Sequence, residues 1–187
     1  MNSYPSYKDS GVEWIGEIPS EWSKSKFKYE IDDFITGGTP DTSNEDYWSD
    51  DGFHWISISD MTSNIGGIIN TKKRITVLGL ESKGLKLLPP ETLIYSIFGS
   101  IGKVNRLKIE STIHQGILGF VPSFQLNTYY LEYFLSHLES LISFFSSSNT
   151  QENLNKEKVK NFQISIPSLP EQKQIVSFLD TKTQKID

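Results

Sequence analysis

Residues 127–145, NTYYLEYFLSHLESLISFF, carry the most regular apolar pattern in the chain. The apolar side chains recur at intervals of three and four residues: Tyr130, Leu131, Phe134, Leu135, Leu138, Leu141, Ile142 and Phe145. This spacing predicts an amphipathic helix that starts near Asn127. At about 1.5 Å per residue it would be roughly 28 Å long, enough to lie across one face of a sheet.

The residues before this helix predict that sheet. Short runs rich in aromatic and β-branched residues, bounded by turn residues, are typical of strands. The expected strands cover residues 53–59, 68–75, 92–97, 104–109 and 113–121. Their short connections are typical of a compact mixed β-sheet or barrel. The predicted fold class is therefore α/β (α+β): a mixed β-sheet or barrel with one long amphipathic helix.

The flanking segments give weaker patterns. Residues 7–19 show neither a helical nor a strand period, and we expect an ordered arm held by Trp14, Ile15 and Trp22. Residues 27–35 place their apolar side chains near helical spacing, so a helix is expected there, and another over residues 78–85.

The chain after the long helix predicts a short helix at 156–160, a strand at 162–166 and a final helix from about Glu171. The final helix shows no stop signal before the last residue. We accordingly expect one domain over residues 1–168 and the start of a coupling or spacer helix over residues 169–187.

Composition narrows the class of protein. The 187 residues are 36% hydrophobic and contain no cysteine, so thiolate metal sites and disulfides are excluded. No apolar run approaches the roughly 18 residues that span a bilayer, and the first residues do not resemble a signal peptide. We therefore expect a cytoplasmic protein without a membrane partner.

The net charge of −5 is unevenly distributed. Residues 1–60 hold 13 acidic and 4 basic side chains, whereas residues 61–187 hold 10 acidic and 14 basic ones. Phosphate contacts require a local basic surface and not a basic whole chain, so the overall charge permits nucleic-acid binding.

Catalytic patterns are missing from the sequence. The histidines (His54, His114 and His137) are too scattered for a metal pair on one helix, and no nucleophile elbow or phosphate-binding loop occurs. Asp41, Glu81 and Lys83 resemble the residue types of a metal-dependent nuclease, but a loop and a helix are unsuited to converge on one Mg²⁺. We expect no catalytic residue and no metal site.

Basic residues occur in three groups that suit DNA. They are Lys72-Lys73-Arg74 beside a turn; Lys103, Arg106 and Lys108 around an expected strand; and Lys156, Lys158 and Lys160 beside a polar tract. Basic side chains hold phosphates, while Asn, Gln, Ser and Arg can read base edges.

The order of several short segments resembles the target-recognition domains of type I restriction–modification specificity subunits. The resemblance covers nearly the whole chain. Its segments are YKDSGVEWIGEIP (7–19) with Trp22, GGTP (37–40), WISISDM (55–61), LLPPET (87–92), GSIGK (99–103), HQG (114–116), TQENL (150–154) and ISIPSLPEQ (164–172) with Ile175 and Leu179. This family more often has Asn where the chain has His114, so no role is inferred for His114.

The resemblance implies a non-catalytic chain that recognises one half of a bipartite site in double-stranded DNA. It also implies the partners: methyltransferase (M) subunits that bind S-adenosylmethionine, a restriction (R) subunit that uses ATP and Mg²⁺, and a second recognition domain or half-subunit copy. No cofactor is expected in this chain. The chain would be a natural half-subunit, a truncated form or the product of a silent cassette.

Candidate DNA-binding residues lie in the expected turns and the polar tract: Thr36, Thr39, Lys72, Lys73, Arg74, Ser100, Lys103, Arg106, Asn149, Gln151 and Asn153. Ile175, Phe178 and Leu179 lie on one face of the last helix and are candidates for packing against a partner helix. Two alternatives stay open. One is a scaffold that binds the methyltransferase subunit without binding DNA alone, and the other is a ligand-binding β module, suggested by the 12% aromatic residues.

Overall fold

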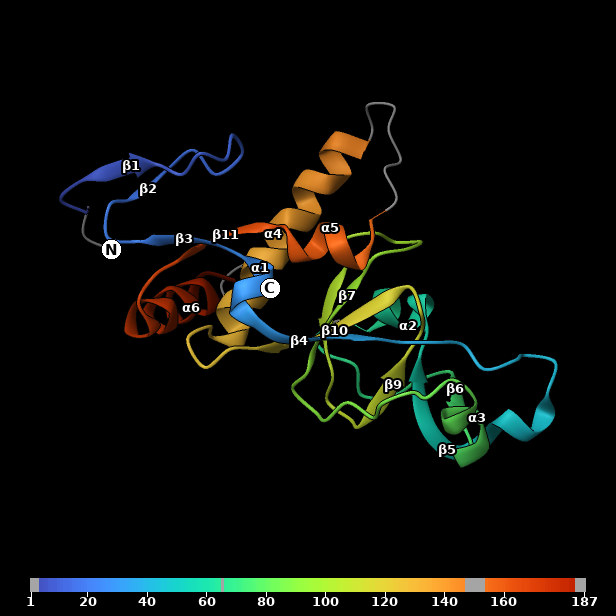
Figure 1. The fold of residues 1–187 in the computed structure, drawn as a ribbon. Helices are drawn as coiled ribbons and strands as arrows, with labels where there is room; N and C mark the ends of the chain where they lie inside the picture. Colours follow the sequence, from blue (N-terminus) through green and yellow to red (C-terminus); the bar gives the residue numbers. More distant parts are fainter. Residues whose placement is uncertain (1–3, 65, 147–153, 184–187) are drawn as a thin grey trace.

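The computed structural model describes residues 4–64, 66–146 and 154–183, and the side chains of residues 140–146 are not described. Figure 1 shows β5, β6, β9 and α3 gathered at one end of the molecule and β1, β2 and α6 at the other. The elements in chain order are β1 (Tyr7–Asp9), β2 (Glu17–Pro19), β3 (Ser23–Lys26), α1 (Phe27–Glu30), β4 (Ile31–Thr36), the 3-10 turn η1 (Glu45–Tyr47), β5 (Trp48–Ile56), α2 (Ile58–Ser63), β6 (Lys73–Ile75), α3 (Val77–Ser82), β7 (Leu93–Ser96), β8 (Val104–Arg106), β9 (Ser111–Ile113), β10 (Ile117–Pro122), α4 (Thr128–Ser146), α5 (Lys156–Lys160), β11 (Gln163–Ile166) and α6 (Leu169–Thr183).

A four-stranded antiparallel sheet in the order β4-β10-β7-β8 forms the centre. Every residue of β7 is buried, because both faces of the sheet are covered. Leu93 and Tyr95 pack on the side of α4, while Ile94 points into a second cluster on the opposite face. This alternation along one strand shows why a continuous apolar run can occupy the middle of a sheet.

The first core cluster lies between the central sheet and α4. Phe34 and Phe120 meet edge to face with ring centroids 5.5 Å apart, and Leu131 and Leu135 of α4 are fully buried beside them. The predicted amphipathic helix is thus confirmed, together with its place across one face of the sheet.

A second sheet, in the order β6-β5-β9, packs next to the opposite face. β5 pairs with β9 in parallel and with β6 antiparallel. Ile56 and Ile113 from this sheet join Ile94 and Ile117 of the central sheet in one cluster. The two sheets therefore share a core.

Two smaller sheets have two strands each, and one of them joins the N-terminal part of the chain to the C-terminal part. β1 and β2 form an antiparallel hairpin, and β3 pairs antiparallel with β11, almost 140 residues later in the sequence. α1 then contacts α5, and α6 packs on α4. Trp14 holds the hairpin against the core by packing on Phe134, and the Trp22 indole donates to Glu171 of α6 at 3.0 Å.

Several sequence-based expectations were wrong in detail. The expected strands 53–59 and 68–75 are cut short, because Ile58–Ser63 is helical and β6 begins only at Lys73. Residues 7–19, expected as an ordered arm without a strand period, contain a β-hairpin. Only residues 27–30 of the segment 27–35 are helical, because the following residues pair with β10 as a strand. Residues 113–121 comprise two strands, β9 and β10, in two different sheets. In the described part of the chain the sheets have open edges, so the mixed sheet is confirmed but the barrel is not.

Candidate nucleic-acid interface

Each of the four strands of the central sheet has one of its termini at the same end of the sheet. β4 and β7 both run antiparallel to β10, with Thr36 opposite Leu118 and Ser96 opposite Ile117. β4 and β7 therefore end where β10 begins. β8 also begins there, because Val104 lies opposite Tyr95. The connections after β4 and β7 consequently leave the sheet from the same edge.

The second sheet brings its strand ends to this edge as well. β5 and β9 are parallel, with Ile56 opposite Ile113, and residues 114–116 lead directly from β9 into β10. β6 begins at Lys73, which lies opposite Trp55 near the end of β5. We call residues 36–40, 57–60, 71–73, 97–103 and 114–116 the loop edge.

Backbone hydrogen bonds tie these segments to one another. The Gly38 N–H donates to the Ile113 carbonyl at 2.9 Å, and the Ile97 N–H donates to the Gly116 carbonyl at 2.8 Å. Gly37 has to be glycine at this place, because an added Cβ would lie 1.9 Å from the Ile113 oxygen. The GGTP segment is therefore a close contact between two connections.

The turn at 97–103 is held by one buried serine. The Ser96 hydroxyl donates to the Ser100 carbonyl and accepts the Lys103 N–H at 3.0 Å, while the Ser96 carbonyl accepts the Gly102 N–H at 2.9 Å. Gly99 and Gly102 adopt φ values of +73° and +89°, a region that favours glycine. The GSIGK segment is thus a braced turn.

Asp60, which is buried, connects two further segments of the loop edge. Its carboxylate accepts the Ser57 N–H at 2.9 Å and the Ser57 hydroxyl at 2.6 Å, completing the capping box of α2. It also accepts the Lys72 N–H at 3.2 Å. This carboxylate fixes the backbone that presents Lys72, and sequence reasoning gave it no such role.

His114 braces the last segment. Its Nδ1 accepts the Gly116 N–H at 2.9 Å, and its ring meets that of Trp55 edge to face at 5.5 Å. Burial lowers the pKa of His114 below its usual 6.5. The accepting nitrogen has to be unprotonated, so burial and hydrogen bonding both favour the neutral ring.

Six candidate residues from separate parts of the sequence meet at the loop edge: Thr36, Thr39, Lys72, Lys73, Ser100 and Lys103. Thr36, Lys72 and Lys73 are exposed. The Thr39 hydroxyl is buried and has no hydrogen-bond partner among the described residues. Lys103 forms an ion pair with Glu139 of α4. Arg74 follows on β6, opposite His54.

Arg106 does not lie at the loop edge. Its side chain is 4% exposed and pairs with Glu132 of α4 and, at 3.2 Å, with Glu91. The guanidinium carbon lies 3.5 Å from the centroid of the Tyr129 ring. In this structure Arg106 joins the central sheet to α4 from inside the protein, and its side chain cannot reach a phosphate without leaving that site. The candidates Asn149, Gln151 and Asn153 lie outside the described residues.

The basic residues Lys156 and Lys160, expected from sequence, lie beside three further lysines, Lys24, Lys26 and Lys28, that sequence reasoning missed. Lys26 on β3 lies opposite Gln163 of β11, which follows α5 directly. On α5, Lys160 forms an ion pair with Glu157 at 2.7 Å, and the charges of Lys160, Lys156 and Lys28 all lower the pKa of Glu157. We call Lys24, Lys26, Lys28, Lys156 and Lys160 the lysine strip.

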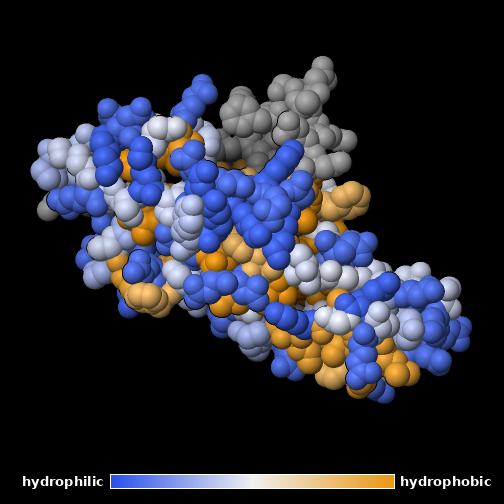
Figure 2. Space-filling view, viewed as in Figure 1, coloured by the Kyte–Doolittle hydropathy of each residue, from blue (hydrophilic) through white to orange (hydrophobic). Residues whose placement is uncertain are grey.

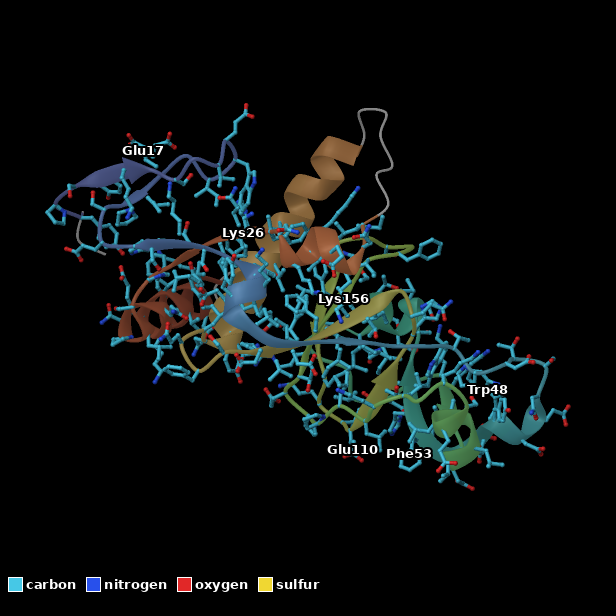
Figure 3. The ribbon with its side chains drawn as sticks, viewed as in Figure 1. Glu17, Lys26, Trp48, Phe53, Glu110 and Lys156 are labelled. Atoms are coloured by element: carbon cyan, nitrogen blue, oxygen red, sulfur yellow. The ribbon has the colours of Figure 1, made fainter. Side chains whose placement is uncertain are left out.

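Figure 3 labels Lys26 and Lys156 on neighbouring elements, and Figure 2 shows hydrophilic residues gathered over this part of the surface. Lys24, Lys26 and Lys28 are exposed. The alternation of Lys24 and Lys26 in residues 23–26 was the available signal, because residues two apart on a strand share a face. These lysines were not singled out from sequence, because residues 1–60 carry an excess of acidic side chains.

The three candidate partner-packing residues have different surroundings. Ile175 packs against the first core cluster of the domain itself. Leu179 is half-buried, while Phe178 is 43% exposed and lies under the Lys182 ammonium at 5.6 Å. An open hollow on α6 is lined by Lys173, Gln174, Ser177, Phe178, Thr181 and Lys182. Of the apolar face expected from sequence, Phe178 is thus the most accessible member.

The possible nuclease residues also have a local explanation. Asp41 accepts the Ser43 N–H at 2.9 Å and the Ser43 hydroxyl at 2.7 Å, and these bonds lower its pKa. Across the described ranges, no group of three or more His, Asp or Glu side chains is arranged to hold a metal ion. The same ranges contain no helix long and apolar enough to span a membrane.

Solved structures with a similar fold are known. A chain from the crystal structure of the HsdS subunit from Thermoanaerobacter tengcongensis superimposes with a TM-score of 0.72 at 22% identity, over 96% of this chain and 41% of that one. A chain from a structure of the type I R-M system gives 0.72 at 23% identity, over 96% and 42%.

Sequence relatives agree with this fold. The Type I restriction enzyme MjaIX specificity subunit of Methanocaldococcus jannaschii is 28% identical over 88% of this chain and 38% of that protein. The EcoR124I/EcoR124II specificity subunit of Escherichia coli is 25% identical over 94% and 42%. The chain thus spans about two fifths of the length of these relatives. The sequence model described as Type I restriction modification DNA specificity domain matches residues 19–187, and the chain belongs to this family.

Proposed function

We propose that this chain binds double-stranded DNA at the loop edge and reads one half of a bipartite recognition site. The observation that carries the proposal is the convergence of five polar connections from two sheets on one edge, in a member of the DNA specificity domain family. Exposed Thr36, Lys72 and Lys73, with Ser100 and Gln115, supply side chains of the kinds that contact base edges and phosphates.

The lysine strip would add phosphate contacts outside the bases that are read. Contacts of this type position a protein on the duplex without distinguishing sequences. Its net charge suits this purpose, because five lysines outnumber the Glu157 carboxylate, which pairs with Lys160 at 2.7 Å. The strip therefore supports binding, while the loop edge supports recognition.

The proposed assembly follows the relatives named as specificity subunits. The chain would direct methyltransferase and restriction subunits to DNA without catalysing a reaction itself. S-adenosylmethionine, ATP and Mg²⁺ would belong to those subunits. Helix α6, from Leu169, would extend toward a methyltransferase subunit or a second recognition domain, with Phe178 as a contact. A chain that binds DNA together with such subunits would be located in the cytoplasm.

A selection from a pool of randomised duplexes tests the central claim. The folded 187-residue chain is incubated with the pool, and bound DNA is recovered and sequenced over successive rounds. We expect enrichment of one short motif. The loop-edge variant with Lys72→Ala, Lys73→Ala and Ser100→Ala should enrich this motif less than the wild-type chain does. Recovery without any enriched motif by the folded wild-type chain would refute sequence recognition and favour the scaffold alternative.

A further inference from the structure

Phe98 is an aromatic side chain held out from the protein at the loop edge. Its side chain is 64% exposed at the start of the braced turn 97–103. The other exposed large apolar residues of the described chain are Tyr7, Tyr29, Ile69, Val77, Leu78, Val121, Phe124, Tyr129 and Phe178, and all of them lie outside the loop edge. An exposed phenylalanine inside a polar surface leaves its apolar area in water, so its position needs a reason.

The backbone beneath Phe98 is fixed on both sides. Ile97 donates its N–H to the Gly116 carbonyl at 2.8 Å, and Gly102 donates to Ser96 at 2.9 Å. An added Cβ on Gly99 would lie 3.2 Å from Ile58, so this turn rests on the start of α2. Phenylalanine has two side-chain torsions, and a ring on a fixed backbone loses little entropy when it is bound.

The neighbours of Phe98 are suited to DNA and not to an apolar protein partner. An added Cβ on Gly116 would lie 3.0 Å from the Phe98 Cβ, which places exposed Gln115 on the adjacent turn. Ser100 lies two residues further along the same turn. A protein-binding patch normally needs a contiguous apolar area of several hundred Å², whereas no other exposed large apolar residue of the described chain lies at the loop edge.

We propose that Phe98 stacks on the face of a base in the recognised half-site and opens the base stack at that step. Apolar side chains are used as wedges between base steps by other DNA-binding proteins, and aromatic rings stack on bases of any sequence. Ser100 and Gln115 then lie where they can contact the edges of the adjacent bases. Phe98 is thereby a DNA-contacting residue that opens one step of the duplex beside the bases that are read, and the inference rests on the DNA-binding function proposed above.

The test uses the motif enriched by the wild-type chain in the selection. Duplexes of that motif carry 2-aminopurine at successive positions, because its fluorescence rises when the base stack around it opens. The variants are Phe98→Ala, Phe98→Leu, Phe98→Tyr and the matched control Phe124→Ala, which removes an exposed phenylalanine outside the loop edge. The thermal unfolding midpoint of each variant is measured in parallel.

We expect wild-type and Phe98→Tyr to raise the fluorescence at one step of the duplex. Phe98→Ala should abolish that signal even at saturation and weaken binding by between about fivefold and about a hundredfold, the range seen when an aromatic ring is removed from a base. Phe98→Leu should bind with intermediate affinity, and Phe124→Ala should match wild type. The unfolding midpoints should agree, because both phenylalanines are exposed.

The possible failures are distinguishable. A wild-type chain that enriches no motif would overturn the DNA-reading function and this inference together. In a second outcome, the wild-type chain enriches a motif that Phe98→Ala binds with the same affinity and the same fluorescence pattern. That result would overturn only the role of Phe98. If Phe98→Ala lost binding to the methyltransferase subunit while its DNA affinity and fluorescence pattern stayed those of wild type, the ring would be a protein contact. This result would also overturn the proposed role of Phe98 in DNA binding.

Discussion

The backbone N–H of Asn127 donates a 2.7 Å hydrogen bond to the side-chain oxygen of Gln172. Gln172 is completely buried in the first turn of α6, and Asn127 caps the start of α4 through its own side chain. The Gln172 amide nitrogen donates to the carbonyls of Gln125 and Pro167, both at 3.0 Å. One side chain thus sets the position of α6 relative to α4.

Replacing Gln172 by Ala should lower the free energy of unfolding by about 3 kcal/mol, because buried backbone groups would lose their partners. Urea denaturation monitored by circular dichroism measures the change. Gln174→Ala, an exposed glutamine on the same helix, is the control and should leave stability unchanged within about 0.5 kcal/mol. Equal stability of the two variants would contradict a role for Gln172 in holding α6.

Arg106 should contribute to stability and not to DNA affinity. Arg106→Ala removes a buried cation from Glu91, Glu132 and the Tyr129 ring. We expect a loss of about 2 kcal/mol, below the value for fully buried pairs because both carboxylates remain accessible to water. Lys108→Ala, which breaks a more exposed pair with Glu91, should cost less than about 1 kcal/mol.

DNA titrations at several salt concentrations check the second half of this prediction. The slope of log affinity against log salt should be the same for Arg106→Ala and wild type, since no phosphate contact is removed. A slope reduced by about 0.9 would mean that Arg106 leaves its internal site to bind a phosphate.

Elements with a local signal were predictable from sequence. The spacing of residues 127–145 predicted α4, and the buried runs predicted β7 and β11 within a residue or two. The segment 27–35 was not predictable in this way. Phe27, Ile31 and Phe34 happen to match a helical period, but Ile31–Thr36 becomes a strand because β10, more than 80 residues later, pairs with it. Tertiary pairing overrides local spacing in such cases.

Some features of the candidate site also have a local sequence signal, and others depend on tertiary contacts. Turn residues indicated which candidates lie near one another, because the connections at one end of a sheet bring side chains of distant segments together. The inward direction of Arg106 depended on Glu132, which only the placement of α4 could reveal. The lysine strip depended on pairing between β3 and β11, which a single sequence does not indicate.

Lys72, Lys73 and Arg74 should contact phosphates. Replacing all three by Ala should weaken DNA binding and reduce the salt slope by up to about 2.7, which is about 0.9 for each phosphate that the variant no longer neutralises. The fold should persist, since β6 is an edge strand and Lys72 and Lys73 are exposed. Lys173→Ala with Lys182→Ala on α6 is the control for a general change in charge. An unchanged slope in the triple variant would exclude this group from the DNA surface.

Lys24, Lys26 and Lys28 should act on affinity without altering sequence preference. Their joint replacement by Ala is expected to weaken binding to the selected motif and to unrelated duplexes by the same factor, because phosphate contacts carry no sequence information. Repeating the selection with this variant should return the wild-type motif. A changed motif would show that the lysine strip contacts bases, and unchanged affinity would place it outside the interface.

Stability should fall on acidification through the titration of His114. Burial lowers the pKa of His114 in the folded chain below 6.5, so the unfolded chain binds more protons than the folded one near and below that pH. The contribution of neutral His114 is therefore complete above about pH 6.5 and is lost as the pH falls below it. His54 adds to the effect in the same direction, because burial and the nearby Arg74 lower its pKa too.

Denaturation midpoints between pH 8 and pH 5 test this dependence, with His114→Gln as the variant. Glutamine keeps a polar group beside the Gly116 N–H but does not titrate, so the loss of stability below about pH 6.5 should be smaller than in wild type. Protonation of His114 also removes the acceptor of the Gly116 N–H, and the carbonyl of this same Gly116 holds the N–H of Ile97, the residue before Phe98. DNA affinity of the wild-type chain should then fall more steeply with acidification than that of His114→Gln, and parallel curves would rule out His114 as the group responsible.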